Sequence, residues 1–125
     1  MSRRWEGNLA RILELRVGPP RDALDRFEAA WNRLAEGRKV QTLSVLTLQD
    51  LPAFVRTLTP ARWELIRRLK IDGPLSIYGL AKRLSRNYKN VHVDASALLA
   101  LGVIRKNDNG KIENAWDVVR AELRL

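Results

Sequence analysis

Hydrophobic residues recur at spacings of three and four in three successive segments between positions 59 and 101, which is the pattern of amphipathic helices. Each segment begins after a residue that suits a helix N-terminus. The expected start residues are Thr59 followed by Pro60, then Ser76, then Asn87. Gly102 is expected to end the third helix. The pattern therefore predicts three short helices around a common core.

A short β-hairpin is expected directly after these helices. Two brief apolar segments flank Asp108-Asn109-Gly110, and Asn109-Gly110 is typical of a two-residue turn in which both residues adopt positive φ. Three helices followed by a hairpin predict a winged helix-turn-helix over residues 58–113. We therefore expect an α+β protein whose central module is three helices plus a β-wing.

Two alternating segments lie outside this module. In residues 11–17, Leu13, Leu15 and Val17 fall on one face, while Glu14 and Arg16 fall on the other, which predicts a half-buried strand. The last eight residues alternate in the same way, with an expected apolar face of Val119, Ala121, Leu123 and Leu125. Opposite charges on the polar faces of the two strands would pair with each other.

The remaining segments complete an extension on the N-terminal side. An amphipathic helix is expected around Leu24, Phe27, Trp31 and Leu34. Residues 40–46 favour a second strand or an extended arm, and Asp50 is expected to cap a short helix through Thr57. The chain then divides into a strand–helix extension for dimerisation or partner binding (1–57), the winged module (58–113) and a C-terminal strand (114–125).

Net charge narrows the choice of partner. The 125 residues include 23 Lys and Arg against 14 Asp and Glu, a formal charge of +9. Eleven of these basic residues but only five of the acidic ones lie in positions 59–113. Basic charge on three helices and a hairpin indicates double-stranded DNA as the partner. No apolar stretch approaches the ~20 residues of a membrane span, and we expect a cytoplasmic protein without a membrane partner.

The sequence offers little for catalysis or metal binding. His92 is the only histidine and there is no cysteine, so a metal site or an activated nucleophile would lack partners. Asp22, Asp25 and Glu28 have the spacing of a solvated helix face. The glycines do not form a phosphate-binding loop. We therefore expect a protein that is not an enzyme and that needs no metal and no cofactor.

The third predicted helix supplies the candidate DNA-reading residues, because the exposed N-terminal end of such a helix enters the major groove. Asn90 can form a bidentate pair with adenine, and Lys89 can reach guanine or a phosphate. Tyr88 suits a phosphate, and Val93 suits a thymine methyl group. The expected DNA-binding set also includes two caps, the outer helix face and the wing: Ser76, Asn87, His92, Ser96, Arg105, Lys106 and Lys111.

The strings LTPARWELIRRL, GPLSIYGLAKRLSRNYKNVHVDASAL, LGVI and DNGKI make residues 58–113 resemble the MarR-like winged-helix transcriptional regulators. More narrowly, the segment resembles small prokaryotic predicted regulators that are often described as antitoxin components of toxin–antitoxin pairs. In that group the third helix usually begins Tyr-Lys-Asn-Val-His-Arg-Asp. This sequence matches the string except at Val93, which replaces the expected basic residue. The substitution implies a different operator, weaker binding or a shift toward a protein partner.

These observations predict a sequence-specific double-stranded DNA-binding transcriptional regulator that acts as a homodimeric repressor. The resemblance adds that it autoregulates as an antitoxin with a cognate toxin protein as partner. Two alternatives stay open. The chain is a protein-interaction module that neutralises a toxin, with DNA binding secondary, or it is a nonspecific architectural protein. The last alternative predicts a steep salt dependence with little sequence preference.

Overall fold

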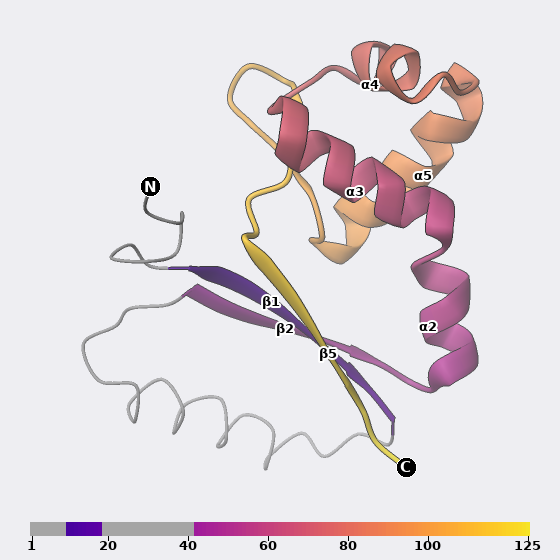
Figure 1. The fold of residues 1–125 in the computed structure, drawn as a ribbon, viewed down its shortest axis with the longest axis vertical. Helices are drawn as coiled ribbons and strands as arrows, with labels where there is room; N and C mark the ends of the chain where they lie inside the picture. Colours follow the sequence, from indigo (N-terminus) through magenta and orange to yellow (C-terminus); the bar gives the residue numbers. More distant parts are fainter. Residues whose placement is uncertain (1–9, 19–41) are drawn as a thin grey trace. The chain divides into compact units, whose positions relative to one another are not determined.

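Strand β1 (Arg11–Val17) is the middle strand of a three-stranded sheet in the computed structural model, which describes residues 10–18 and 42–125. Its neighbours β2 (Thr42–Leu48) and β5 (Val118–Leu123) both run parallel to it (Figure 1). The register places Leu15 between Leu46 and Ala121. The predicted extended segment at 40–46 is therefore a strand that begins slightly later, and the two predicted terminal strands pair with each other. The helix predicted around Trp31 lies outside the described residues.

The burial of β1 differs from the predicted half-buried pattern. Leu13, Leu15 and Val17 are buried as expected, but Arg16 is only 2% exposed. Its guanidinium group donates to a carboxylate oxygen of Glu14 at 3.0 Å. The prediction of a solvated polar face was wrong for this strand, because a strand with parallel neighbours on both sides is usually covered on both faces.

The burial of β5 differs in the opposite sense. Ala121 is exposed, Leu123 is 57% exposed and Leu125 is fully exposed, so the predicted buried apolar face was wrong for these three residues. The reason is that β5 is an end strand of the described sheet, and nothing described covers that side of it. The register sets Glu14 beside Arg120 and Arg16 beside Glu122, so the opposite charges are aligned as predicted, although Arg120 makes no ion pair with Glu14.

Gly18 ends β1 at a point where a side chain has no room. Its φ is +139°, a conformation that side chains of L-residues rarely adopt. A Cβ atom there would lie 2.7 Å from Arg124 Cβ and 2.9 Å from the Arg124 carbonyl oxygen. Its N–H donates to the Leu48 carbonyl at 3.1 Å, so the glycine joins the ends of all three strands.

Four helices follow β2 in the described part of the chain: α2 (Leu51–Thr57), α3 (Pro60–Asp72), α4 (Ile77–Leu84) and α5 (Tyr88–Leu101). Each has the predicted cap, because the side chains of Asp50, Thr59, Ser76 and Asn87 accept hydrogen bonds from backbone N–H groups of the first turn. Gly73 and Gly102 end α3 and α5 at positive φ. Local capping rules therefore predicted these helices and their starts.

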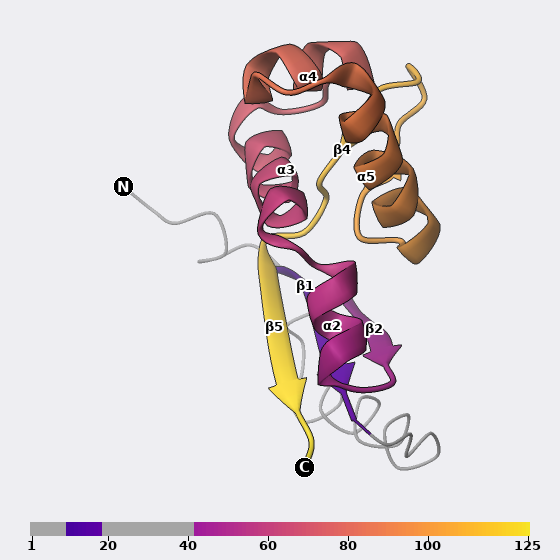
Figure 2. The same cartoon turned by 90° about the vertical axis from the view of Figure 1, so that its right-hand side faces the viewer.

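Helices α3, α4 and α5 pack around one core together with a hairpin of β3 (Arg105–Lys106) and β4 (Ile112–Glu113) (Figure 2). The core residues are Leu65, Ile66, Leu69, Leu80, Ala81, Val91, Ala95, Leu98, Val103, Ile104 and Ile112. Ile112 and Leu75 exchange backbone hydrogen bonds of 2.9 and 3.0 Å. This bridge fixes the hairpin to the segment that precedes α4.

The hairpin turn is not the predicted two-residue type. The Asn107 N–H donates to the Lys111 carbonyl at 2.8 Å, and the Gly110 N–H donates to the Asn107 carbonyl at 3.0 Å. Gly110 has φ +78°, but Asn109 does not have positive φ, since Ser85 is the only described non-glycine residue that does. The loop therefore contains three residues and a glycine bulge. Asn107 favours it, because its side-chain oxygen accepts from the N–H groups of Asn109 and Lys111.

The described residues form an α+β structure of two compact units. One contains the sheet, and the other is continuous in sequence from Arg56 to Ala115 and contains α3, α4, α5 and the hairpin. Within residues 10–18 and 42–125, no helix is long and apolar enough to cross a membrane.

Candidate nucleic-acid interface

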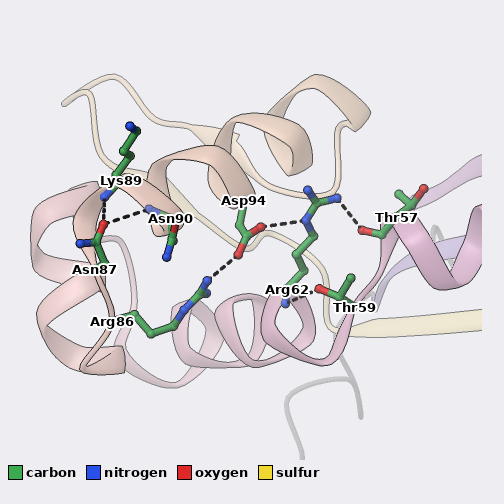
Figure 3. Close-up of polar contacts among 8 residues, drawn as sticks. All are labelled: Thr57, Thr59, Arg62, Arg86, Asn87, Lys89, Asn90 and Asp94. Carbon is green, nitrogen blue, oxygen red and sulfur yellow. Dashed lines mark hydrogen bonds and ion pairs between the residues drawn. The ribbon is translucent and has the colours of Figure 1, made fainter.

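The first turn of α5 presents two of the predicted contact residues to solvent. The Asn87 side-chain oxygen accepts from the backbone N–H of Lys89 at 2.8 Å and of Asn90 at 3.4 Å (Figure 3). The oxygen of Asn87 is thus used for capping, which leaves the side chains of Lys89 and Asn90 exposed for contacts with another molecule. Figure 3 shows the Lys89 side chain extending away from the body of the unit.

The outer face of α5 continues this surface. His92, Val93 and Ser96 are exposed, as predicted, while Val91, Ala95 and Leu98 face the core. The Tyr88 ring lies 6.0 Å from the His92 ring, centroid to centroid, in a tilted arrangement. We call the exposed set Tyr88, Lys89, Asn90, His92, Val93 and Ser96 the α5 surface. It offers donors, acceptors and one small apolar group, which is the chemistry that reads base edges.

A carboxylate on the side of α5 holds this helix in place. Asp94 accepts from Arg62 Nε at 3.0 Å and from Arg86 Nη2 at 2.8 Å (Figure 3). Arg62 also donates from Nη1 to the Thr57 carbonyl at 2.9 Å. The side chains of Asp94, Arg62 and Arg86 are 15%, 18% and 27% exposed, so solvent screens these ion pairs only in part.

The arginine–aspartate network was not predicted from the sequence. Its partners lie 32 and 8 residues from Asp94 and outside α5, so the periodicity of one helix does not link them. Arg62 belongs to α3 and Arg86 to the turn between α4 and α5. The network therefore fixes α5 relative to both of these elements, and the two arginines are occupied inside the protein.

Helix α4 contributes a smaller exposed surface. Ser76, a predicted DNA contact, is exposed, and its hydroxyl oxygen accepts from the Gly79 N–H at 3.0 Å as the helix cap, which leaves its O–H able to donate. Tyr78 is 63% exposed, and the Lys82 ammonium group lies 5.4 Å from the centroid of its ring. This exposed aromatic–cation pair was not predicted from the sequence, where only the spacing of four residues on one helix indicates it.

Two of the basic residues of α3 lie beside acids. Arg67 and Arg68 lie 3.6 and 3.9 Å from the carboxylate of Glu64, and Arg68 also lies 3.7 Å from Asp72. Arg83 of α4 approaches the same Asp72 carboxylate at 3.2 Å. Each of these two acids is shared by two arginines, so the ion pairs reduce the positive charge of α3 without cancelling it.

The hairpin contains the predicted basic residues, but they are not equivalent. Arg105 Nε donates to the Glu113 carboxylate at 2.6 Å, so its charge is balanced. Lys106 and Lys111 are exposed. A shallow hollow of about 330 Å³ lies here, lined by Arg105, Lys106, Asn107, Asp108 and Glu113. Its mixture of both charges argues against an anion pocket and leaves the two lysines as the free cations of the hairpin.

Four lysines of the helical unit make no ion pair in the described structure: Lys82, Lys89, Lys106 and Lys111. One lies on α4, one on the first turn of α5 and two on the hairpin. In Figure 1 the hairpin loop lies at the upper left of the unit and the start of α5 at the upper right, with α4 between them. These four lysines therefore lie on three elements of the unit, and each of them would attract a polyanion.

No metal-binding group accompanies these residues, since residues 10–18 and 42–125 contain no cluster of three or more metal-ligand side chains. Comparison with known proteins gives one match. The model of the HVO_A0114 family matches residues 57–121, slightly more than half of the chain. No curated protein and no solved structure matches the chain.

Proposed function

The chain belongs to the HVO_A0114 family, and we propose that it is a sequence-specific double-stranded DNA-binding transcriptional regulator. In this proposal α3, α4, α5 and the hairpin form a winged helix-turn-helix of the MarR-like type, and a homodimer acts as repressor. The observation that carries the proposal is the α5 surface, in which exposed Lys89 and Asn90 occupy the first turn of a helix whose other face is buried.

The connection between α4 and α5 supports a helix-turn-helix. Only three residues separate the two helices, and Ser85 adopts a left-handed conformation with φ 53° and ψ 44°. Its N–H and that of Arg86 close the turn onto carbonyls of α4. A tight turn of this length is typical of the helix pair that places a recognition helix in the major groove.

The distribution of roles follows from the geometry. Asn90 is the candidate for base reading, because its amide group is exposed and can pair with adenine in two hydrogen bonds. Lys89, Lys106 and Lys111 are the candidates for phosphate contacts, because their charges are not balanced inside the protein. Arg105 is a weaker candidate, since Glu113 already holds its guanidinium group.

A DNA titration tests the proposal. The wild-type protein is titrated with duplex from immediately upstream of its own gene and with a scrambled duplex, each at two salt concentrations. We expect preference for the upstream duplex that persists at the higher salt. Equal, salt-sensitive binding to both duplexes would instead favour a nonspecific architectural role.

Two variants separate the predicted roles on α5. Asn90→Ala is expected to lower affinity by about 1–3 kcal/mol and to relax the preference at one base pair. Lys89→Ala is expected to weaken binding to all sequences and to reduce the salt slope by about 1. Arg67→Ala is the control, because it removes an exposed cation of α3 that lies outside the α5 surface. If both α5 variants bind like the control, α5 is not the reading helix.

One observation favours a second candidate function. Tyr78, Tyr88 and Val93 are exposed by 63%, 49% and 56%, so the helices of this surface also present apolar area. Such area suits a protein partner, as expected for an antitoxin that neutralises a toxin. Failure of the wild type to bind any upstream duplex, together with capture of the protein encoded by the adjacent gene, would favour this alternative.

A further inference from the structure

Strand β5 presents an unpaired edge in the described sheet. The Arg124 N–H donates to the Val17 carbonyl at 2.7 Å, so the backbone groups of the even-numbered residues face β1. The backbone N–H and C=O groups of Val119, Ala121 and Leu123 therefore face away from β1. Among the described strands none lies on that side, since the order is β2-β1-β5. Such an edge is a template for another strand.

The residues of β5 are complementary to themselves when the strand is reversed. Arg120 and Glu122 lie one position on either side of Ala121, and Val119 and Leu123 lie two positions on either side. A two-fold axis at Ala121 would set each arginine opposite the glutamate of the other strand. It would also set each valine opposite the leucine. We propose that β5 pairs antiparallel with β5 of a second copy of this chain, centred on Ala121.

The backbone supports this register. The outward-facing groups belong to Val119, Ala121 and Leu123, and the same axis pairs these residues with Leu123, Ala121 and Val119 of the second copy. Every outward N–H and C=O of the strand then meets a partner, as in the hydrogen-bonded positions of an antiparallel pair. Arg120 and Glu122 fall at the intervening positions, where opposite side chains approach most closely.

The exposure and charges of β5 fit a second copy as occupant. Arg120 is exposed and makes no ion pair in the described structure, whereas Glu122 holds Arg124 at 2.9 Å and keeps a second carboxylate oxygen for another cation. Ala121, at the axis, is small enough for two strands to meet there. Leu123, which is 57% exposed, would be covered by Val119 of the second copy. The result would be a continuous six-stranded sheet with isologous contacts.

This inference specifies the homodimer of the proposed function, but its test measures association without DNA. Sedimentation equilibrium of the full chain at micromolar concentration is expected to show a dimer. Arg120→Glu gives two facing pairs of acids, and Glu122→Arg gives two facing pairs of bases. Each variant alone is expected to raise the dimer dissociation constant by roughly tenfold or more.

The decisive sample is an equimolar mixture of the two variants. Pairing between an Arg120→Glu chain and a Glu122→Arg chain restores opposite charges at both positions, so the mixture is expected to dimerise like the wild type. Mixing cannot repair effects within one chain, where Arg120 and Glu122 lie beside Glu14 and Arg16. Circular dichroism of each variant confirms folding, and Arg67→Glu on α3 is the charge-matched control.

The possible results are distinguishable from failure of the DNA-binding proposal. A wild type that remains monomeric, a single variant that dimerises like the wild type, or a mixture that stays monomeric would each overturn the β5 pairing. Binding of the upstream duplex in any of these cases leaves the regulator proposal standing. A wild type that dimerises but does not bind the upstream duplex would support the β5 pairing and contradict the regulator proposal.

Discussion

At the scale of single residues, Asp94 decides how firmly the α5 surface is held. Its carboxylate meets Arg62 of α3 and Arg86 of the preceding turn, so one side chain joins three parts of the unit. Both arginines would otherwise add positive charge near a candidate DNA surface. In the proposed function their charge serves to position α5, and the free lysines would attract the phosphates.

We predict that Asp94→Asn destabilises the protein by about 1–2 kcal/mol, because two partly buried guanidinium groups lose a charged acceptor. Loss of a negative charge alone would strengthen binding to DNA. A positioning role predicts weaker binding to the preferred duplex with an unchanged salt slope. Urea unfolding and DNA titration measure both effects.

The charge-matched control for this variant is Asp108→Asn in the exposed hairpin loop. It removes the same charge without breaking the network, so its affinity is expected to stay equal or rise. Weaker binding by both variants to the same extent would contradict a specific role of Asp94.

At the scale of elements, features that depend on nearby residues were predicted from the sequence, and features that depend on distant residues were not. Helix starts at Thr59, Ser76 and Asn87 were predicted because each cap acts within three residues. The predicted type of hairpin turn was wrong, because the side chain of Asn107 stabilises a three-residue loop and Asn107 lies outside the expected turn residues. The parallel order β2-β1-β5 could not be predicted, since alternation reveals a strand but not its neighbours.

In the candidate site, too, the features that depend on nearby residues were predicted and those that depend on distant residues were not. The exposed side of α5 follows from helical periodicity, and every residue predicted on it is exposed. The use of Ser76 and Asn87 as caps was predicted too, and it leaves the Ser76 O–H and the Asn87 side-chain NH2 able to donate to another molecule. The balance of Arg105 by Glu113 depends on the pairing of β3 with β4 and was not foreseen.

The hairpin provides the next prediction. The double variant Lys106→Ala/Lys111→Ala is expected to reduce the salt slope of DNA binding by about 2, because each lysine would release about one counterion. The preference between upstream and scrambled duplexes is expected to remain. Arg105→Ala is the comparison and should change the slope less, since Glu113 balances that charge. A slope unchanged by the double variant would remove the hairpin from the interface.

The sheet provides another prediction at this scale. Gly18→Ala is expected to lower the free energy of unfolding by about 1–3 kcal/mol, because it combines a strained φ with a contact of 2.7 Å to Arg124 Cβ. Gly102→Ala is the matched control, with positive φ but no atom within 4 Å of the added Cβ. Its cost is expected to be about 1 kcal/mol. Equal losses in the two variants would show that crowding at Gly18 has no effect.

At the scale of the whole molecule, the two units divide the proposed activities. The helical unit carries the candidate DNA surface, and the sheet carries the candidate dimer edge. A dimeric DNA-binding protein has higher affinity for an operator with two half-sites about one helical turn apart than for a single half-site. The affinity of a monomeric DNA-binding protein is not raised by the second half-site.

We therefore predict that the wild type binds a palindromic operator more tightly than a single half-site, and that Arg120→Glu loses this advantage. Its affinity for the single half-site is expected to equal that of the wild type, because β5 is outside the DNA-contacting unit. Titrations of both proteins with both duplexes measure the ratio. An advantage that persists in a monomeric variant would contradict coupling through the sheet.

The parallel pairing of β1 with β5 also determines the order in which the chain can fold. The Arg11 N–H meets the Asp117 carboxylate across 106 positions of sequence, whereas α3, α4, α5 and the hairpin lie in one continuous stretch. Contacts between distant positions close slowly, so we expect the helical unit to gain its structure before β5 reaches β1. During that interval β5 has two unpaired edges, and it can pair with β1 of a neighbouring chain in place of β1 of the same chain. Correct closure and strand exchange thus compete for the same strand, and refolding yield will fall as chain concentration rises.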